Sequence, residues 1–138
     1  MRISSRLAPT TVAKAHCDIP CGIYDPSGAQ LAARTVARMV ELIDGLDPAD
    51  NSMANRQKFV RCVMVKEQHA ELVKREVQVI WSDYFKPEHV GKFPQIHELT
   101  WNILKLAGKN KQNVDAEAAA QLIAKVEEFS AIFWETKK

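Results

Sequence analysis

The sequence has no long hydrophobic run, few cysteines and little excess of charge, and each shortage excludes a class of protein. No stretch approaches the roughly 18 consecutive apolar residues of a membrane span, so we expect no membrane partner. Three cysteines are few and odd in number, which is untypical of a secreted disulfide scaffold and favours a reducing compartment, the cytoplasm. The formal net charge is only +2, which predicts no nucleic-acid partner. A chain of 138 residues, 46% of them hydrophobic, suits one globular domain.

The first 15 residues differ from the rest in composition. They contain Arg2, Arg6 and Lys14 but none of the 17 acidic residues. The run AKA at 13–15 has the small-x-small form of a cleavage site, and a cut after it leaves His16 first. The stretch lacks the apolar centre of about 7–15 residues that a secretory signal has. These residues indicate a leader that is removed, with an organelle transit peptide or a tail that stays on as alternatives.

Apolar residues recur at helical spacing over most of the remaining chain, and no stretch alternates as a convincing strand would. Asp25-Pro26-Ser27 is a typical helix start. We therefore predict an all-α protein, an antiparallel four-helix bundle with an irregular N-terminal segment. The expected helices cover residues 30–46, 50–83, 94–107 and 115–134, with a bend or break near Asn55, a turn at 85–87 and a polar loop at 108–113.

The irregular segment at residues 16–26 reads HCDIPCGIYDP. Cys17 and Cys21 stand four residues apart, and His16 directly precedes the first of them. Two prolines and a glycine exclude a regular helix or strand here. A loop that holds so many chemically able side chains is more typical of a site than of a spacer.

Cleavage before His16 would create a free α-amine next to a cysteine. The amine, the amide nitrogen of Cys17 and the Cys17 thiolate form short chelate rings, so they are able to bind a metal in one plane. Cys21 would complete that plane with a second sulfur. Planar donation by nitrogen and sulfur suits copper or nickel rather than tetrahedral zinc. The His16 imidazole remains available above the plane, where a fifth ligand supports redox chemistry.

Other interpretations of Cys17 and Cys21 stay open on spacing alone. The pair loosely fits half of a zinc site, although no second Cys/His pair follows at the expected distance. It also fits a disulfide or a pair of unreactive loop thiols. The third cysteine, Cys62, lies among apolar residues of an expected helix, where we predict a small buried hydrophobic side chain.

The run HCDIPCGIYDP resembles the nickel-binding hook of the nickel-dependent superoxide dismutase family, whose usual form is H-C-D-x-P-C-G-x-Y-D-P. The match continues to the C-terminus of the chain. It includes VKEQ at 65–68, WSDYFKP at 81–87 and FWETKK at 133–138.

The resemblance implies a division of the chain into parts. Residues 1–15 would be a propeptide, which a maturation peptidase removes by cutting after Ala15. Residues 16–138 would be the nickel superoxide dismutase domain, with the hook at 16–24 and the helical bundle at 25–138.

By the same resemblance, one nickel ion per subunit is held by the His16 amine, the Cys17 amide and the thiolates of Cys17 and Cys21, with the His16 imidazole as axial ligand of Ni(III). Pro20 would follow a cis peptide bond. The subunits would form a homohexamer in which each hook packs against neighbours. The implied activity is disproportionation of superoxide into dioxygen and hydrogen peroxide, with nickel cycling between Ni(II) and Ni(III). A nickel or copper binding or delivery protein without turnover is the alternative.

Further residues receive roles from the resemblance. Tyr24 is expected to order water and restrict access beside the metal, which makes it, with His16, a candidate catalytic residue. Asp18 would hold the hook by hydrogen bonds, Tyr84 would pack near Tyr24, and Lys86 would tie down the hook or attract the anion. The ordinary alternatives are a tyrosine at a helix entrance, an exposed aspartate, a core-edge tyrosine and a surface lysine.

The chain departs from the family at one pair of positions. Some members carry a Glu–Arg pair that steadies the axial histidine, and Ala32 and His69 stand at those positions here. A metal-bound histidine normally has a hydrogen-bonding partner. Either His69 serves His16 directly, or another acceptor or water does. A mid-helix histidine making a routine contact is the plain alternative for His69.

Overall fold

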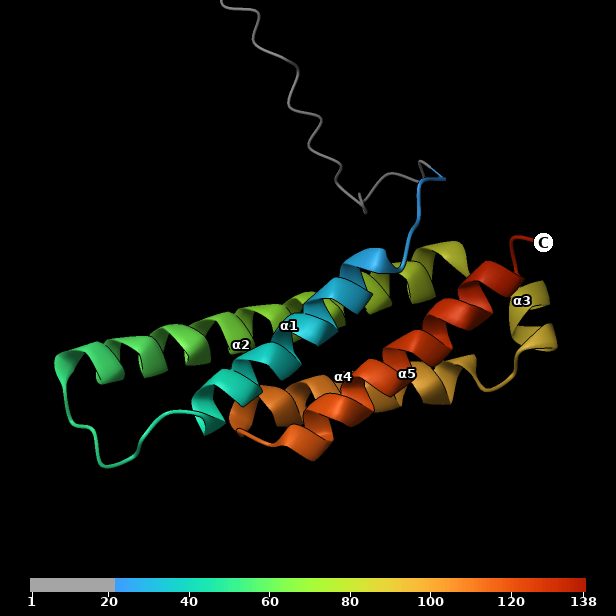
Figure 1. Cartoon of the computed structure of the whole chain (residues 1–138). Helices are drawn as coiled ribbons and strands as arrows, with labels where there is room; N and C mark the ends of the chain where they lie inside the picture. Colours follow the sequence, from blue (N-terminus) through green and yellow to red (C-terminus); the bar gives the residue numbers. More distant parts are fainter. Residues whose placement is uncertain (1–21) are drawn as a thin grey trace, which may run out of the picture.

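A computed structural model describes residues 22–138 of the chain (Figure 1). Residues 22–138 form helices and contain no strand, so the all-α prediction is confirmed. None of the described helices combines the length and the apolarity that crossing a membrane requires. The elements in chain order are α1 (Ser27–Asp44), α2 (Met53–Val79), the π-helical turn η1 (Ile80–Tyr84), α3 (Pro87–Lys92), α4 (Ile96–Gln112) and α5 (Ala116–Glu135).

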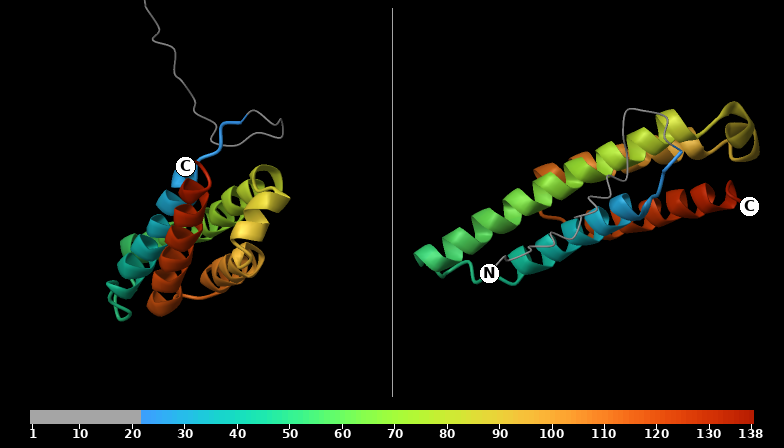
Figure 2. Two further views of the ribbon diagram at one scale, coloured as in Figure 1. Left: turned by 90° about the vertical axis from the view of Figure 1, so that its right-hand side faces the viewer. Right: turned by 90° about the horizontal axis from the view of Figure 1, so that it is seen from above.

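Helices α1, α2, α4 and α5 form the predicted four-helix bundle. Helix α1 packs against α2 and α5, and α4 packs against the same two helices from the other side. Neighbouring helices run in opposite directions, as the views in Figures 1 and 2 show. The short helix α3 lies at the end of the bundle where the chain terminates (Figure 1). Tyr24, just before α1, belongs to this same end, because α1, η1 and the last turn of α5 meet there.

The core is a single cluster of buried side chains, to which each bundle helix contributes one apolar face. Burying a side chain the size of valine, leucine or phenylalanine stabilises the fold by roughly 1.5–3 kcal/mol. Helix α1 contributes small residues, since Ala29, Ala32 and Ala33 are all buried, and this lets its backbone approach its neighbours closely. Helix α1 also buries Val36 and Val40, while the largest apolar side chains of the core come from the other bundle helices, among them Ile103, Leu122, Phe129 and Phe133.

The predicted bend or break near Asn55 is wrong. Helix α2 begins only at Met53, and Asn55 stabilises that start instead of interrupting a longer helix. Its backbone N–H donates to the Ser52 hydroxyl at 3.2 Å. Its side-chain amide donates to the carbonyls of Asp47 at 3.0 Å and Asp50 at 2.8 Å. Ser52 thus caps the helix, and the Asn55 side chain ties the preceding loop to its first turn.

The predicted polar loop at 108–113 is also wrong, because α4 continues to Gln112. Asn110 is fully buried, and its side-chain amide donates to the carbonyls of Leu106 at 2.9 Å and Ala118 at 3.0 Å. These bonds satisfy both N–H groups of the buried side-chain amide, whereas its Oδ1 has no hydrogen-bond partner among the described residues. The helix α3 that follows the predicted turn at 85–87 was not predicted at all.

Candidate metal centre and the tyrosine cluster beside it

The described chain begins at the end of the predicted hook and is fixed to the bundle within a few residues. Gly22 has a φ of +74°, a left-handed conformation that glycine adopts without strain. Ile23 is exposed, whereas Tyr24 is buried, with 9% of its surface accessible. Asp25 then accepts a hydrogen bond from the Ser27 backbone at 2.7 Å, where α1 begins. Any group in the hook is therefore only a few residues from a fixed point on the bundle.

Tyr24 lies beside Tyr84, which ends the π-helical turn η1. The centroids of the two rings are 5.6 Å apart, with the planes inclined at 52°. Tyr84 also contacts Phe133 at 4.6 Å and Phe85 at 5.4 Å, and it stacks on His89 at 5.5 Å. The structure thus brings together the two tyrosines named from the sequence, while their roles at a metal stay predictions.

The last turn of the chain holds the outer side of Tyr84. The Tyr84 hydroxyl oxygen lies 2.7 Å from the Thr136 hydroxyl oxygen, which in turn lies 2.6 Å from the Phe133 carbonyl. The Lys137 ammonium lies 4.6 Å from the centroid of the Tyr84 ring. Sequence reasoning assigned no role to Thr136 or Lys137, although the run FWETKK that contains them resembled the family.

Lys86 and His69 lie on different elements, and Lys86 is exposed whereas His69 is half-buried. Lys86 is exposed at the start of α3, one residue after Phe85, and its backbone N–H donates to the His89 ring at 3.2 Å. His69 is half-buried in α2, and its Nδ1 lies 2.8 Å from the carbonyl of Val65. Because a carbonyl only accepts, that Nδ1 carries the hydrogen, and Nε2 is the nitrogen left to face any other group.

The positive charge around this end of the molecule is partly paired. Lys138 forms an ion pair with Glu135 at 2.7 Å. This hydrogen-bonded ammonium, with a smaller contribution from Lys92, holds the pKa of Glu135 below its ordinary value. Glu135 is exposed to solvent at the end of α5, so the pairing is a surface feature of the region near Tyr84.

The predicted metal ligands and their closest supports lie outside the described residues, namely His16, Cys17, Asp18, Pro20 and Cys21. The donor types they offer, an amine, an amide, two thiolates and an imidazole, fit nickel or copper. In residues 22–138 no group of three or more histidine, cysteine, aspartate or glutamate side chains could hold a metal ion. The described part of the chain thus offers no competing metal site.

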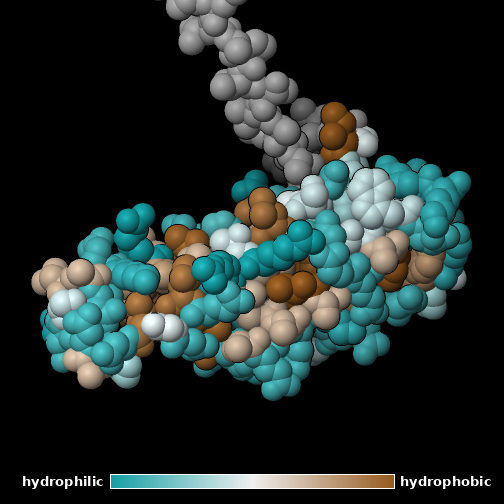
Figure 3. Space-filling view, in the orientation of Figure 1, coloured by the Kyte–Doolittle hydropathy of each residue, from teal (hydrophilic) through white to brown (hydrophobic). Residues whose placement is uncertain are grey.

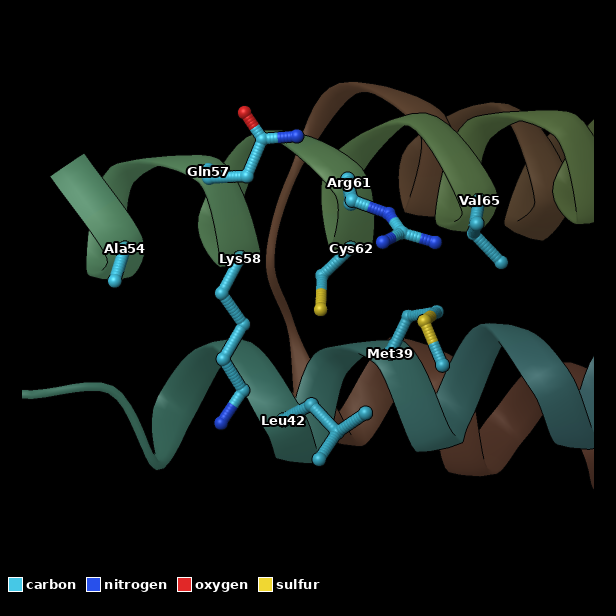
Figure 4. Close-up of a pocket in the computed structure, with 8 residues that line it drawn as sticks. All are labelled: Met39, Leu42, Ala54, Gln57, Lys58, Arg61, Cys62 and Val65. Carbon is cyan, nitrogen blue, oxygen red and sulfur yellow. The ribbon is translucent and has the colours of Figure 1, made fainter.

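A cavity of the described chain lies elsewhere, between the C-terminal half of α1 and the first half of α2 (Figure 4). It has a volume of about 520 Å³, and Met39, Leu42 and Val65 contribute to its largely apolar lining. Cys62 is buried and free, as predicted, and its thiol points into this cavity (Figure 4). Since Tyr24 precedes the opposite end of α1, the third cysteine is remote from Tyr24.

A family model described as nickel-containing superoxide dismutase matches residues 11–137. The chain belongs to the nickel-containing superoxide dismutase family. Two relatives, each named superoxide dismutase [Ni], come from Streptomyces coelicolor and Streptomyces seoulensis. They are 38% and 37% identical to this chain over 136 residues, which cover 99% of this chain and 98% of each relative.

Solved structures of nickel superoxide dismutase share the fold. A native structure is 38% identical, has a TM-score of 0.78 and aligns with 89% of this chain and all of its own. A structure whose nickel ligation corresponds to the oxidised state is 35% identical, with a TM-score of 0.77, over 88% of this chain and 98% of its own. The described helices therefore form the bundle of the nickel superoxide dismutase family.

Proposed function

We propose that this chain is a superoxide dismutase that converts two superoxide anions and two protons into dioxygen and hydrogen peroxide. The observation that carries the proposal is its membership of the nickel-containing superoxide dismutase family over nearly its whole length. The burial of Tyr24 against Tyr84, three residues after the second hook cysteine, supports it. The chain is thereby an oxidoreductase with nickel as its cofactor.

His16, Cys17 and Cys21 would hold one nickel ion per subunit through the amine, the amide, the two thiolates and the imidazole. When bound, nickel supplies a one-electron Ni(III)/Ni(II) couple, which electron-rich thiolate and amide donors bring into the range of superoxide chemistry. The protein must also keep bulk water and larger molecules from this centre. Tyr24, buried at the base of the hook, is the residue proposed for that work.

The supporting residues have separate proposed tasks. Asp18 and Pro20 would fix the shape of the hook. The exposed ammonium of Lys86 would attract the superoxide anion towards the end of the bundle that carries Tyr84, an effect that salt would weaken. The Nε2 atom of His69 would accept a hydrogen bond from His16, since Nδ1 is already engaged by Val65.

Maturation would proceed by removal of residues 1–15. While Ala15 is attached, the His16 nitrogen belongs to an amide and is not a basic amine. The test compares protein that begins at His16 with protein that begins at Met1, both given nickel, in an assay of superoxide disproportionation. We expect turnover only from the trimmed chain. Full activity in the chain that begins at Met1 would overturn this maturation step.

The same experiment separates the dismutase from a nickel or copper binding or delivery protein. Trimmed protein that takes up one nickel per chain but does not disproportionate superoxide would favour the second function. Trimmed protein that binds no nickel and keeps a Cys17–Cys21 disulfide under mild reductant would contradict both.

A homohexamer is the proposed assembly. Support comes from large apolar side chains that the bundle leaves exposed, and apolar patches interrupt the hydrophilic surface in Figure 3. The most exposed of these apolar side chains include Met53, Leu31, Trp101, Met64 and Trp134. Light scattering on the trimmed protein gives the subunit count, and a monomer at micromolar concentration would contradict the proposal.

Cytoplasmic location is proposed from the use of free thiols, and cell fractionation would distinguish it from an organelle.

A further inference from the structure

We propose that Thr136 and Lys137, in the last turn of the chain, are positioning residues for Tyr84. They hold its ring beside Tyr24 and commit its hydroxyl hydrogen to Thr136, so that Tyr84 offers the metal end of the bundle only a hydrogen-bond acceptor. The geometry stands on the described residues alone, whereas its consequence for catalysis rests on the proposed function.

The direction of the hydrogen bonds follows from counting hydrogens. Thr136 has one hydroxyl hydrogen, and its oxygen lies 2.6 Å from the carbonyl of Phe133, which only accepts. Thr136 therefore donates to Phe133. Its oxygen also lies 2.7 Å from the Tyr84 hydroxyl, and in that contact Thr136 has no hydrogen left to give. Tyr84 must be the donor, which leaves only the lone pairs of its oxygen for other partners.

Lys137 acts on the ring instead of the hydroxyl. Its ammonium lies 4.6 Å from the centroid of Tyr84 and 5.3 Å from that of Phe133, within the range of a cation–π contact. The Tyr84 ring is therefore confined by Lys137 together with Phe133 and the stacked ring of His89. A ring confined in this way keeps a fixed relation to its other neighbour, Tyr24, at 5.6 Å.

The hydrogen bond to Thr136 limits what Tyr84 can do. An incoming superoxide anion is stabilised by donors, and Tyr84 cannot donate to it without giving up its bond to Thr136. Tyr84 is instead able to orient a water molecule or another donor by accepting a hydrogen bond. The C-terminal turn thus sets the role of Tyr84 as an acceptor beside Tyr24.

The first test needs neither nickel nor turnover. The chain has only two tyrosines, so in a Tyr24→Phe background the tyrosine Raman doublet reports Tyr84 alone. The intensity ratio of this doublet distinguishes a phenol that donates from one that accepts. We expect a donor signature that is lost in Thr136→Val and kept in Thr136→Ser. An unchanged doublet in Thr136→Val would overturn the hydrogen-bond assignment, even if the trimmed protein proved inactive.

The second test is a double-mutant cycle on nickel-loaded, trimmed protein. We expect Thr136→Val to lower kcat/KM by roughly tenfold, the effect of one hydrogen bond, and Thr136→Ser to restore it. In a Tyr84→Phe background Thr136→Val should have no further effect, because the hydroxyl it orders is gone. A purely structural role at the end of α5 would give the same loss in both backgrounds. That result, with nickel content equal in all four proteins, would overturn the proposal.

Lys137 has a matched control in its neighbour. Lys137→Met and Lys138→Met remove the same charge from the same turn, but only Lys137 lies over the Tyr84 ring. We expect Lys137→Met to lower kcat/KM several-fold more than Lys138→Met at high salt, where attraction of the anion is screened. Equal effects of the two substitutions would show that Lys137 contributes charge only, and would overturn its positioning role.

Discussion

The ammonium of Lys66 in α2 lies against the backbone carbonyl of Asn110 in the last turn of α4. The same Nζ lies 3.0 Å from the carbonyl of Lys111 and 2.9 Å from that of Asn113. Lys66 is buried, with 1% of its surface accessible. Its three hydrogens therefore meet carbonyls that a helix end leaves without intrahelical partners, and the charge suits the negative end of the helix dipole. One side chain thus joins α2 to the connection between α4 and α5.

Replacing Lys66 with methionine should lower the free energy of unfolding by about 3 kcal/mol, because buried carbonyls lose their donor while the packing volume is largely kept. Chemical denaturation of the metal-free protein measures the effect. Lys58→Met is the matched control, since Lys58 is an exposed lysine of the same helix. Equal stability of the two variants would contradict the role given to Lys66.

Asn110→Leu tests the second buried polar contact at this helix end. The leucine would leave the carbonyl of Ala118 without the donor it has at 3.0 Å, so we expect a loss of about 2 kcal/mol in unfolding free energy. Asn113→Leu is the control, because the Asn113 side chain is exposed and bonds only within its own turn, to Lys109. A smaller loss in Asn110→Leu than in Asn113→Leu would refute the explanation of why α4 continues past residue 107.

These contacts explain which parts of the fold the sequence could predict. Helical periodicity is a local property, so it located the bundle helices from single stretches of sequence. The end of α4 depends on Lys66, which lies 44 residues earlier, and on Ala118, which follows in the next helix. The polar run at 108–113 has the composition of a loop, and nothing within it indicates that its polar groups find partners inside the bundle. Local composition alone therefore ended the helix too early.

The candidate site divides in a similar way. The predicted metal donors His16, Cys17 and Cys21 lie within six residues of one another, so their spacing alone suggested a metal site beside other interpretations. Their binding of nickel stays a prediction. The surroundings of Tyr84 are not contiguous, because its hydroxyl meets Thr136 across 52 residues. The run that contains Thr136 resembles the family, but nothing in it predicts a contact with Tyr84. Which group a tyrosine donates to is a property of the folded chain.

The pH dependence of stability should reveal the contact between α1 and α5 at Glu127. Arg34 donates to this carboxylate at 2.8 Å, and Gln30 donates to its other oxygen. The hydrogen bond from Arg34, and then that from Gln30, hold the pKa of Glu127 below its ordinary 4.5. A lowered folded-state pKa contributes stability that is present above pH 4.5 and lost as the pH falls through the lowered value.

Glu127→Gln should therefore cost about 0.5 kcal/mol near neutral pH, a small value because both partners are largely exposed and screened by solvent. The difference from the unsubstituted chain should shrink towards zero in acid. Denaturant titrations across the acidic range would measure it. Glu128→Gln serves as control, since Glu128 pairs only with Lys125 inside α5. A difference that grows as the pH falls would have the wrong sign for this contact.

Cys21 and Cys62 should respond differently to replacement by serine. In trimmed protein, Cys21→Ser removes one of two predicted thiolates, so we expect loss of nickel binding and of activity with the helical content and melting temperature of the metal-free bundle unchanged. Cys62→Ser places a hydroxyl in the cavity between α1 and α2, at the other end of α1 from Tyr24. It should lower stability by about 1 kcal/mol through burial of a polar group while leaving the nickel content at one per chain. Metal analysis, circular dichroism and the superoxide assay on the same preparations distinguish the two effects. If Cys62→Ser lost nickel and Cys21→Ser kept it, the assignment of the metal to the N-terminal hook would be wrong.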